Sequence, residues 1–177
     1  MIEHNNLTNA LISFATQLSV QSADKLVAIT SIGFDIAGLE CYMPLISGAQ
    51  VIIANAHQTK DMRQLSELLE KTQATIFQAT PALWRMLLDE QSDIGCDLKI
   101  LVGGEALPGD MAARLLRNSG AVWNVYGPTE TTIWSTLSLL ETSKTPSIGR
   151  PINNTQVYIL NSALMPAAIG VTGELYI

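Results

Sequence analysis

The chain has 177 residues, of which 47% are hydrophobic and 15% are charged, and this composition is that of a globular protein with an apolar core. Its net charge of -6, with ten lysines and arginines in all, argues against a protein that binds nucleic acid through a basic face. The two cysteines, Cys41 and Cys96, lie far apart without Cys or His neighbours at ligand spacing, which argues against a disulfide framework or a zinc site.

The N-terminal segment MIEHNNLTNALISFATQLSV lacks the basic start, continuous apolar core and cleavage site of a signal peptide. No apolar run reaches membrane-spanning length, so we expect a cytoplasmic chain without a membrane partner. The segment leads into a predicted helix with no strand before it, and the chain ends inside the strand-like run GELYI. A sheet cut in this way would carry unpaired edges, so we expect part of a larger domain with marginal stability on its own.

Short apolar or β-branched runs then alternate with amphipathic helical patterns. The predicted strands cover residues 25–30, 49–54, 74–79, 98–104 and 121–127, and the predicted helices cover 36–46, 62–71, 81–90 and 110–117. Pro81 suits the first turn of its helix, where the missing N–H has no partner to lose. This order predicts an α/β fold, in which a mainly parallel sheet is flanked by helices.

The pattern changes after Thr132. The run IWSTLSLLE is followed by the polar loop TSKTP, the turn GRP, and the strand-like runs QVYIL and GELYI. We therefore expect the α/β part to cover about residues 1–140 and the start of a β-rich part to cover about residues 141–177.

The stretch NVYGPTET follows a predicted strand of the sheet, and ligands of open α/β sheets bind at the carboxyl ends of strands. Asn124 and Tyr126 offer hydrogen-bonding groups and a flat face for a base, and Gly127 lets backbone approach a ligand. Thr129 offers a hydroxyl for phosphate and Glu130 a hard oxygen for Mg²⁺. The combination predicts a nucleotide site, while a turn with a core tyrosine and a solvated glutamate has similar weight on spacing alone.

Two further segments carry candidate site residues. LVGGE ends the preceding predicted strand, which would place Gly103 and Gly104 at the same sheet edge. The chain contains neither GxGxxG nor GxxxxGK[ST], so it shows no phosphate-cradling loop of those kinds. In GFDIAGLE, Asp35 stands at the start of a predicted helix, where it could cap the helix or pair with a ligand ammonium in a pocket.

The segments FDIAGLE, GGEAL, NVYGPTET, IGRPINNTQVYIL and GVTGELYI occur in an order that resembles the adenylation domains of nonribosomal peptide synthetases, in the AMP-forming acyl-activating superfamily. The resemblance runs from Met1 to Ile177 and covers the middle of such a domain. Family members let the carboxylate of an amino acid attack the α-phosphate of ATP, release pyrophosphate, and pass the aminoacyl group to a carrier-protein thiol. The resemblance implies ATP and Mg²⁺ as cofactors, a phosphopantetheine thiol on a peptidyl carrier domain, and a condensation domain as a further partner.

The resemblance also implies roles for individual residues. Thr129 and Glu130 would be catalytic, through the α-phosphate and through Mg²⁺. The expected nucleotide-binding residues are Gly103, Gly104, Glu105, Asn124, Tyr126, Gly127 and Thr129. The expected amino-acid pocket consists of Asp35, Ile36, Leu39, Gln78, Leu101, Gly103, Val125, Ile133 and Trp134, with Asp35 on the substrate ammonium. This set resembles pockets that select glycine or another small amino acid, because Trp134 and Leu39 could fill the space of a side chain.

Other parts of the family's machinery have no counterpart in the sequence. These are the Ser/Thr- and Gly-rich phosphate loop, the ribose-binding aspartate and the C-terminal catalytic lysine, so we expect the chain alone to be inactive. Two alternatives stay open: a non-catalytic remnant that serves as an interaction module, and a member that activates an aryl or fatty acid. Asp35 weighs against the second alternative, because such substrates carry no ammonium.

Overall fold

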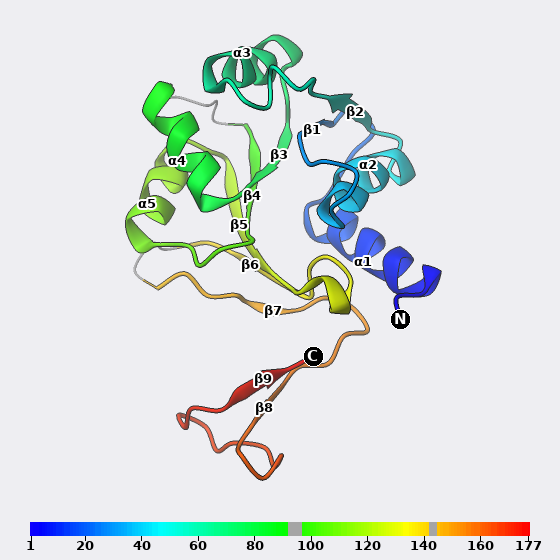
Figure 1. The fold of residues 1–177 in the computed structure, drawn as a ribbon, viewed down its shortest axis with the longest axis vertical. Helices are drawn as coiled ribbons and strands as arrows, with labels where there is room; N and C mark the ends of the chain where they lie inside the picture. Colours follow the sequence, from blue (N-terminus) through cyan, green and yellow to red (C-terminus); the bar gives the residue numbers. More distant parts are fainter. Residues whose placement is uncertain (92–96, 142–144) are drawn as a thin grey trace.

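In the computed structural model, the described residues are 1–91, 97–141 and 145–177. They form a sheet with helices on both faces and a separate hairpin near the C-terminus (Figure 1). Cys96 and most of the predicted polar loop TSKTP lie outside the described residues. Cys41 is a free, half-buried thiol.

The predicted alternation of strands and helices is confirmed. The helices are α1 (His4–Gln17), α2 (Ile36–Ile46), α3 (Met62–Thr72), α4 (Pro81–Glu90) and α5 (Gly109–Arg117), with a short 3₁₀ turn, η1 (Thr129–Thr131). The strands are β1 (Lys25–Ala28), β2 (Gln50–Ile53), β3 (Ile76–Ala79), β4 (Lys99–Val102), β5 (Ala121–Tyr126), β6 (Thr136–Leu139), β7 (Arg150–Pro151), β8 (Tyr158–Leu160) and β9 (Glu174–Tyr176).

The main sheet has seven strands in the order β2-β1-β3-β4-β5-β6-β7. Strands β1 to β5 pair in parallel, whereas β6 and β7 return antiparallel along the β5 edge. The sheet is therefore mainly parallel, as predicted, and β7 extends it as far as Pro151. The chain adds β2 on one side of β1 and then β3 on the other, and such a reversal of direction is where ligands bind in open α/β sheets.

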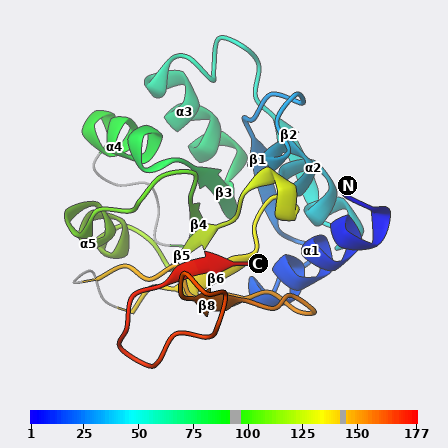
Figure 2. The same ribbon diagram turned by 60° about the horizontal axis from the view of Figure 1, so that its bottom comes forward.

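Helices cover both faces of the sheet. Helices α1 and α2 lie on one face and α3, α4 and α5 on the other, as both ribbon views show (Figures 1 and 2). Each face has its own apolar core, one centred on Phe14, Met43 and Leu101 and the other on Phe77 and Trp84. Because the central strands are buried on both sides, they read as continuous apolar runs rather than alternating ones.

Short-range hydrogen bonds explain where the helices around the sheet begin. The Thr80 hydroxyl accepts a hydrogen bond from the backbone N–H of Leu83, and Pro81 occupies the first turn of α4 as predicted. The Asp61 carboxylate caps α3 in the same way, by accepting from the N–H groups of Arg63 and Gln64. No helix of the described residues is both long and apolar enough to cross a bilayer.

The run IWSTLSLLE departs from the extended conformation that its composition favours. Thr132 and Ile133 have positive φ angles of 74° and 66°, so the chain makes a left-handed turn there and β6 begins only at Thr136. A positive φ is a genuine outlier for a β-branched residue and is held only where the surrounding structure over-determines it. The turn aims the next residue, Trp134, back into the protein, where it is 3% exposed.

A polar cluster ties together the amino ends of β1, β3 and β4. The Asp24 carboxylate accepts hydrogen bonds from the Thr75 hydroxyl (2.6 Å), the Gln21 backbone N–H (2.8 Å) and the Lys99 ammonium (2.9 Å). Burial alone would raise the pKa of Asp24, but the bonds from Thr75 and Gln21 and the charge of Lys99 together outweigh burial and hold the pKa below its usual value.

This cluster makes the free energy of unfolding depend on pH in the acid range. Because the folded pKa of Asp24 lies below the unfolded value of about 3.9, its contribution is fully present above that pH and is lost as the pH falls through the folded pKa. Asp24→Asn is expected to lower the free energy of unfolding near neutrality by roughly 2 kcal/mol, because Lys99 loses its charged partner. Urea denaturation at several acid pH values should show that the free energy of unfolding falls more steeply with decreasing pH in the parent than in Asp24→Asn. An equal dependence on pH in the two proteins would contradict the lowered pKa of Asp24.

Candidate active site

A small cavity of about 90 Å³ lies at the reversal point between β1 and β3. The residues after the two strands line it, together with side chains from α2 and α4. Four residues of the predicted amino-acid pocket take part, namely Ile36, Gln78, Gly103 and Trp134. Its volume is well below the roughly 300–1,000 Å³ of typical ligand pockets, so it has room only for a very small group.

A second cavity, of about 450 Å³, lies at the carboxyl ends of the neighbouring strands β4 and β5. The glycine-containing loops that follow β4 and β5 meet at this cavity because Val102 of β4 pairs with Asn124 of β5, so both strands end at the same level of the sheet. The predicted nucleotide-binding residues Gly104, Glu105, Asn124, Tyr126 and Gly127 all line it, in the company of apolar residues such as Leu107 and Ile148. A half-exposed tyrosine ring among apolar walls suits a flat base.

Trp134 contributes to the walls of both cavities. Its ring sits so close to Gly103 that a Cβ added there would lie 3.1 Å from the indole, and only 2.6 Å from the side chain and carbonyl oxygen of Val125. The Val125 backbone therefore requires a glycine at position 103, whereas the indole would need to shift by only a few tenths of an ångström to accept a Cβ. The two cavities adjoin through a single aromatic side chain.

A chain of buried hydrogen bonds holds this side chain. The indole N–H of Trp134 donates to Gln78 Oε1 at 2.9 Å, and Gln78 Nε2 donates to Glu40 Oε1 at 3.3 Å. Glu40 also accepts from the Thr30 hydroxyl (2.7 Å) and from the backbone N–H groups of Ile29 (3.0 Å) and Thr30 (2.9 Å). Burial raises the pKa of Glu40, and these hydrogen bonds act in the opposite direction.

Asp35 directly precedes Ile36, which lines the small cavity, but Asp35 itself is not among the lining residues. It is half-buried at the N-cap of α2, where its Oδ1 accepts a hydrogen bond from the Ile36 N–H at 2.8 Å. Oδ2 makes no hydrogen bond to any other described residue, so the capping role leaves one carboxylate oxygen able to meet a ligand ammonium. Capping and substrate binding are compatible at this position.

Thr129 and Glu130 form the exposed 3₁₀ turn that follows β5, next to the larger cavity but outside its lining. Among the described residues, no three His, Cys, Asp or Glu side chains gather as a metal site. A lone exposed carboxylate nevertheless fits Mg²⁺, which keeps several waters and is held by one or two carboxylates and by substrate phosphates. The roles of Thr129 and Glu130 remain predictions.

Gly127 is needed for a reason other than the approach of a ligand. A Cβ at this position would lie 2.5 Å from the backbone nitrogen of Ser135 and 2.7 Å from Cα of Trp134. The close approach accompanies a hydrogen bond from Ser135 N–H to the Tyr126 carbonyl at 2.8 Å. The glycine thus lets the chain fold back on itself after η1 and bring Trp134 to the sheet edge.

The other predicted pocket residues belong to the core around the two cavities. Leu39, Leu101 and Ile133 are 4% exposed or less and line neither cavity, and Val125 lines the larger one. Leu39 packs in the core around Phe14 and Met43, and its role toward a substrate stays a prediction. Leu101 offers its backbone carbonyl to the indole N–H of Trp84 at 3.2 Å.

Comparisons with known proteins found a matching family, relatives and similar solved structures. The profile of the family described as AMP-binding enzyme matches residues 1–177, the whole chain. The chain belongs to this family. Its relatives include a dimodular nonribosomal peptide synthase of Bacillus subtilis (strain 168), 44% identical over 100% of this chain and 8% of that protein. A PKS-NRPS hybrid synthetase of Aspergillus niger is 37% identical over 99% of this chain and 10% of its own length.

A solved structure matches this member of the AMP-binding family in detail. The crystal structure of a four-domain nonribosomal peptide synthetase bound to AMP and glycine superposes with a TM-score of 0.95 and 40% identity, over 98% of this chain and 13% of that one. The predicted resemblance to adenylation domains of peptide synthetases is thus confirmed. The chain spans a small part of the length of each of these relatives.

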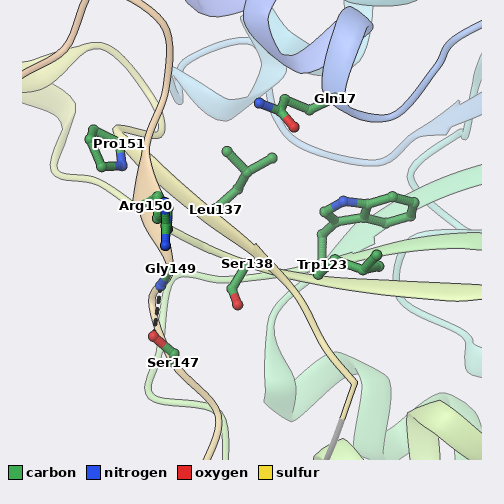
Figure 3. Close-up of a pocket in the computed structure, with 9 residues that line it drawn as sticks. Gln17, Trp123, Leu137, Ser138, Ser147, Gly149, Arg150 and Pro151 are labelled. Atoms are coloured by element: carbon green, nitrogen blue, oxygen red, sulfur yellow. Dashed lines mark hydrogen bonds between the residues drawn. The ribbon is translucent and has the colours of Figure 1, made fainter.

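Another cavity of the AMP-binding chain, of about 530 Å³, contains none of the predicted site residues. It lies between Gln17 of α1 and the edge of the sheet formed by β5, β6 and β7 (Figure 3). Among the described residues of its lining, Arg150 is the single ionisable side chain, and the Gly149 N–H in its wall is bonded to the Ser147 hydroxyl. These described residues offer no pair of groups for acid-base chemistry and no carboxylate for an ammonium.

Sequence reasoning missed the residues that build the small cavity from β1 and α2, above all Glu40 and Thr30. A signal for Glu40 was present, because it is the one charged residue in the otherwise apolar helix IAGLECYMPLI. A carboxylate on such a helix must find hydrogen-bond donors when it is buried. Nothing in the local sequence pointed to Thr30.

Proposed function

We propose that the chain is part of an adenylation domain that activates glycine, or another very small amino acid, as the aminoacyl adenylate. The observation that carries this proposal is the pair of adjoining cavities, in which a space of about 90 Å³ opens beside one of about 450 Å³ across Trp134. The smaller space suits a substrate almost without side chain, and the larger suits a nucleotide. The glycine and AMP bound by the 40% identical neighbour support the same assignment.

The amino acid is held from two sides in this proposal. The Asp35 carboxylate pairs with the α-ammonium through the oxygen that does not cap α2, and Trp134 closes the space that a side chain would need. An aryl or fatty acid would leave Asp35 without its cationic partner and would not fit the small cavity. These contacts select for small size and for an α-amino group at once.

The nucleotide side uses residues of the larger cavity. Tyr126 stacks on the adenine ring and Asn124 reads its edge; the amide of Asn124 already donates to the Ser147 carbonyl at 2.8 Å, which leaves its oxygen as acceptor for an amino group. Thr129 contacts the α-phosphate, and Glu130 binds Mg²⁺, which neutralises charge as pyrophosphate leaves. These residues align reactants and supply no protein nucleophile.

The lengths of the relatives support the remaining parts of the proposal. Because the chain matches only 8% of the dimodular synthase and 13% of the four-domain structure, we propose that it works within a longer synthetase. A condensation domain and a peptidyl carrier domain are then its partners, and the aminoacyl group passes to the carrier's phosphopantetheine thiol. The catalytic parts not found in this sequence would come from the rest of that protein.

Amino-acid-dependent exchange of pyrophosphate into ATP by the full-length protein that contains this chain tests the function. We expect the highest kcat/KM with glycine, at least roughly tenfold lower kcat/KM with alanine, and none with leucine, an aryl acid or a fatty acid. Exchange with an aryl or fatty acid and none with glycine would overturn the choice of substrate. No exchange with any acid would favour the non-catalytic alternative.

A further inference from the structure

The position of Trp134 depends on hydrogen bonds whose direction can be deduced. An indole N–H can only donate, and an ionised carboxylate can only accept. Gln78 lies between the two, so its Oε1 must face Trp134 and its Nε2 must face Glu40, as the distances of 2.9 Å and 3.3 Å show. A change that puts a donor where Glu40 now accepts from Gln78 therefore leaves two donors opposed, either between residue 40 and Gln78 or between Gln78 and the indole.

Glu40 makes more hydrogen bonds than Gln78 or Trp134, the two residues whose positions depend on it. It is 1% exposed on α2 and accepts four hydrogen bonds, three of which come from the Ile29–Thr30 segment that follows β1. Gln78 comes from β3 and Trp134 from the turn before β6, so one carboxylate joins three parts of the fold at the small cavity. Glu40 and Gln78 themselves line this cavity.

We propose that Glu40 is a positioning residue for substrate size: through Gln78 it holds the indole of Trp134 in the place where it disfavours side chains larger than hydrogen in the small cavity. This inference rests on the proposed function and adds a residue to it. Glu40 lies behind the residues predicted to contact the amino acid and acts through them. The expected consequence of loosening it is a loss of discrimination rather than a loss of nucleotide chemistry.

The variant Glu40→Gln tests the chain of bonds without changing its volume. Its amide oxygen must face the two backbone N–H groups of Ile29 and Thr30, so its NH₂ group faces Gln78. If Gln78 keeps its orientation, its NH₂ meets the new NH₂ at position 40; if it turns, its NH₂ meets the indole N–H of Trp134. Either way two donors face each other in the row of bonds that holds the indole, so the indole is fixed less firmly than in the parent.

The second variant combines Glu40→Gln with Gln78→Glu. It restores the alternation of donors and acceptors, with the amide now at position 40 and the carboxylate at position 78. The carboxylate introduced at position 78 can accept from both the new amide and the Trp134 indole, and the number of buried charges is unchanged. Gln78→Glu alone is the matched control: it places two carboxylates next to each other and should also lower the ratio of the glycine to the alanine kcat/KM. A residue with a merely structural role would not be rescued by this exchange.

The measurement is pyrophosphate exchange by the full-length protein with glycine and with alanine, each with separate kcat and KM. We expect Glu40→Gln to lower the ratio of the glycine to the alanine kcat/KM roughly tenfold, mainly through the KM for the amino acids, with a smaller change in the KM for ATP because Trp134 also lines the larger cavity. The double variant should return the ratio to within about threefold of the parent.

The outcomes separate this inference from the function on which it rests. A parent protein that exchanges with neither amino acid overturns the proposed function. A parent that prefers glycine, with an unchanged ratio in Glu40→Gln, overturns only the role of Glu40. If Glu40→Gln alone does not fold, a folded double variant with the parental ratio supports the inference, and one with the low ratio of Gln78→Glu overturns it. Failure of every variant to fold would also overturn it, because Glu40 would then be needed for the fold itself.

Discussion

Asp35→Asn is expected to lower kcat/KM for glycine-dependent pyrophosphate exchange roughly 10- to 100-fold, which corresponds to about 1.5–3 kcal/mol for a hydrogen bond to a charged group. The asparagine keeps an oxygen for the Ile36 N–H and so keeps the cap of α2. It removes the negative charge that the proposed function places on the substrate ammonium. Steady-state exchange with varied glycine, by the full-length protein, measures the effect.

Asp61→Asn is the matched control for this variant. Asp61 is the N-cap residue of α3 and Asp35 that of α2, although Asp61 accepts from the N–H groups of Arg63 and Gln64 and Asp35 only from that of Ile36. Asp61 is exposed and lies in neither cavity. Asparagine is about as good a cap as aspartate, so this variant should leave both stability and exchange close to those of the parent. If Asp35→Asn keeps glycine exchange within about twofold of the Asp61→Asn value, Asp35 is a helix cap only and the predicted contact to the ammonium is wrong.

Gly149→Ala is expected to lower the free energy of unfolding by about 3–5 kcal/mol. Gly149 has a φ of 81°, and a Cβ there would lie 1.9 Å from the carbonyl oxygen of Leu137, the residue that pairs with Arg150 across β6 and β7. Neither a rotamer change nor a small shift can relieve a clash between two pieces of backbone. Chemical denaturation of parent and variant gives the difference.

Gly170→Ala separates backbone strain from the clash. Gly170 has almost the same φ, 84°, but a Cβ there would meet no atom within 4 Å. Its substitution should therefore cost only the left-handed conformation, about 1–2 kcal/mol. Equal losses in the two alanine variants would show that β7 does not pack on β6 as the structure has it.

The sequence predicted the elements of the sheet better than their arrangement. The runs KLVA, IFQA and KILV are strands because their side chains face a core on both sides, and that pattern is visible locally. The place of β1 between β2 and β3, and the antiparallel return of β6, depend on pairings between distant residues. The left-handed turn at Thr132 and Ile133 was hidden, because β-branched residues favour extended backbone.

The candidate site was predicted only in part, again because local patterns are visible in the sequence and contacts between distant residues are not. Residues in recognisable segments, such as Asn124, Tyr126 and Gly104, line the larger cavity, and their contacts to a nucleotide stay predictions. The small cavity was less accessible to sequence reasoning, because it is made where the ends of β1 and β3 meet α2 and α4. Leu39 is core rather than lining, since a helix face alone does not tell whether a neighbour is substrate or protein.

The shared wall has a thermodynamic consequence. Because Trp134 lines both cavities, any displacement of its indole on filling one of them changes the free energy of filling the other. Linkage then requires the two effects to be equal: the factor by which a ligand in the small cavity changes the affinity for a ligand in the larger one is the factor by which the second ligand changes the affinity for the first. One aromatic side chain thereby couples the occupancies of the two cavities.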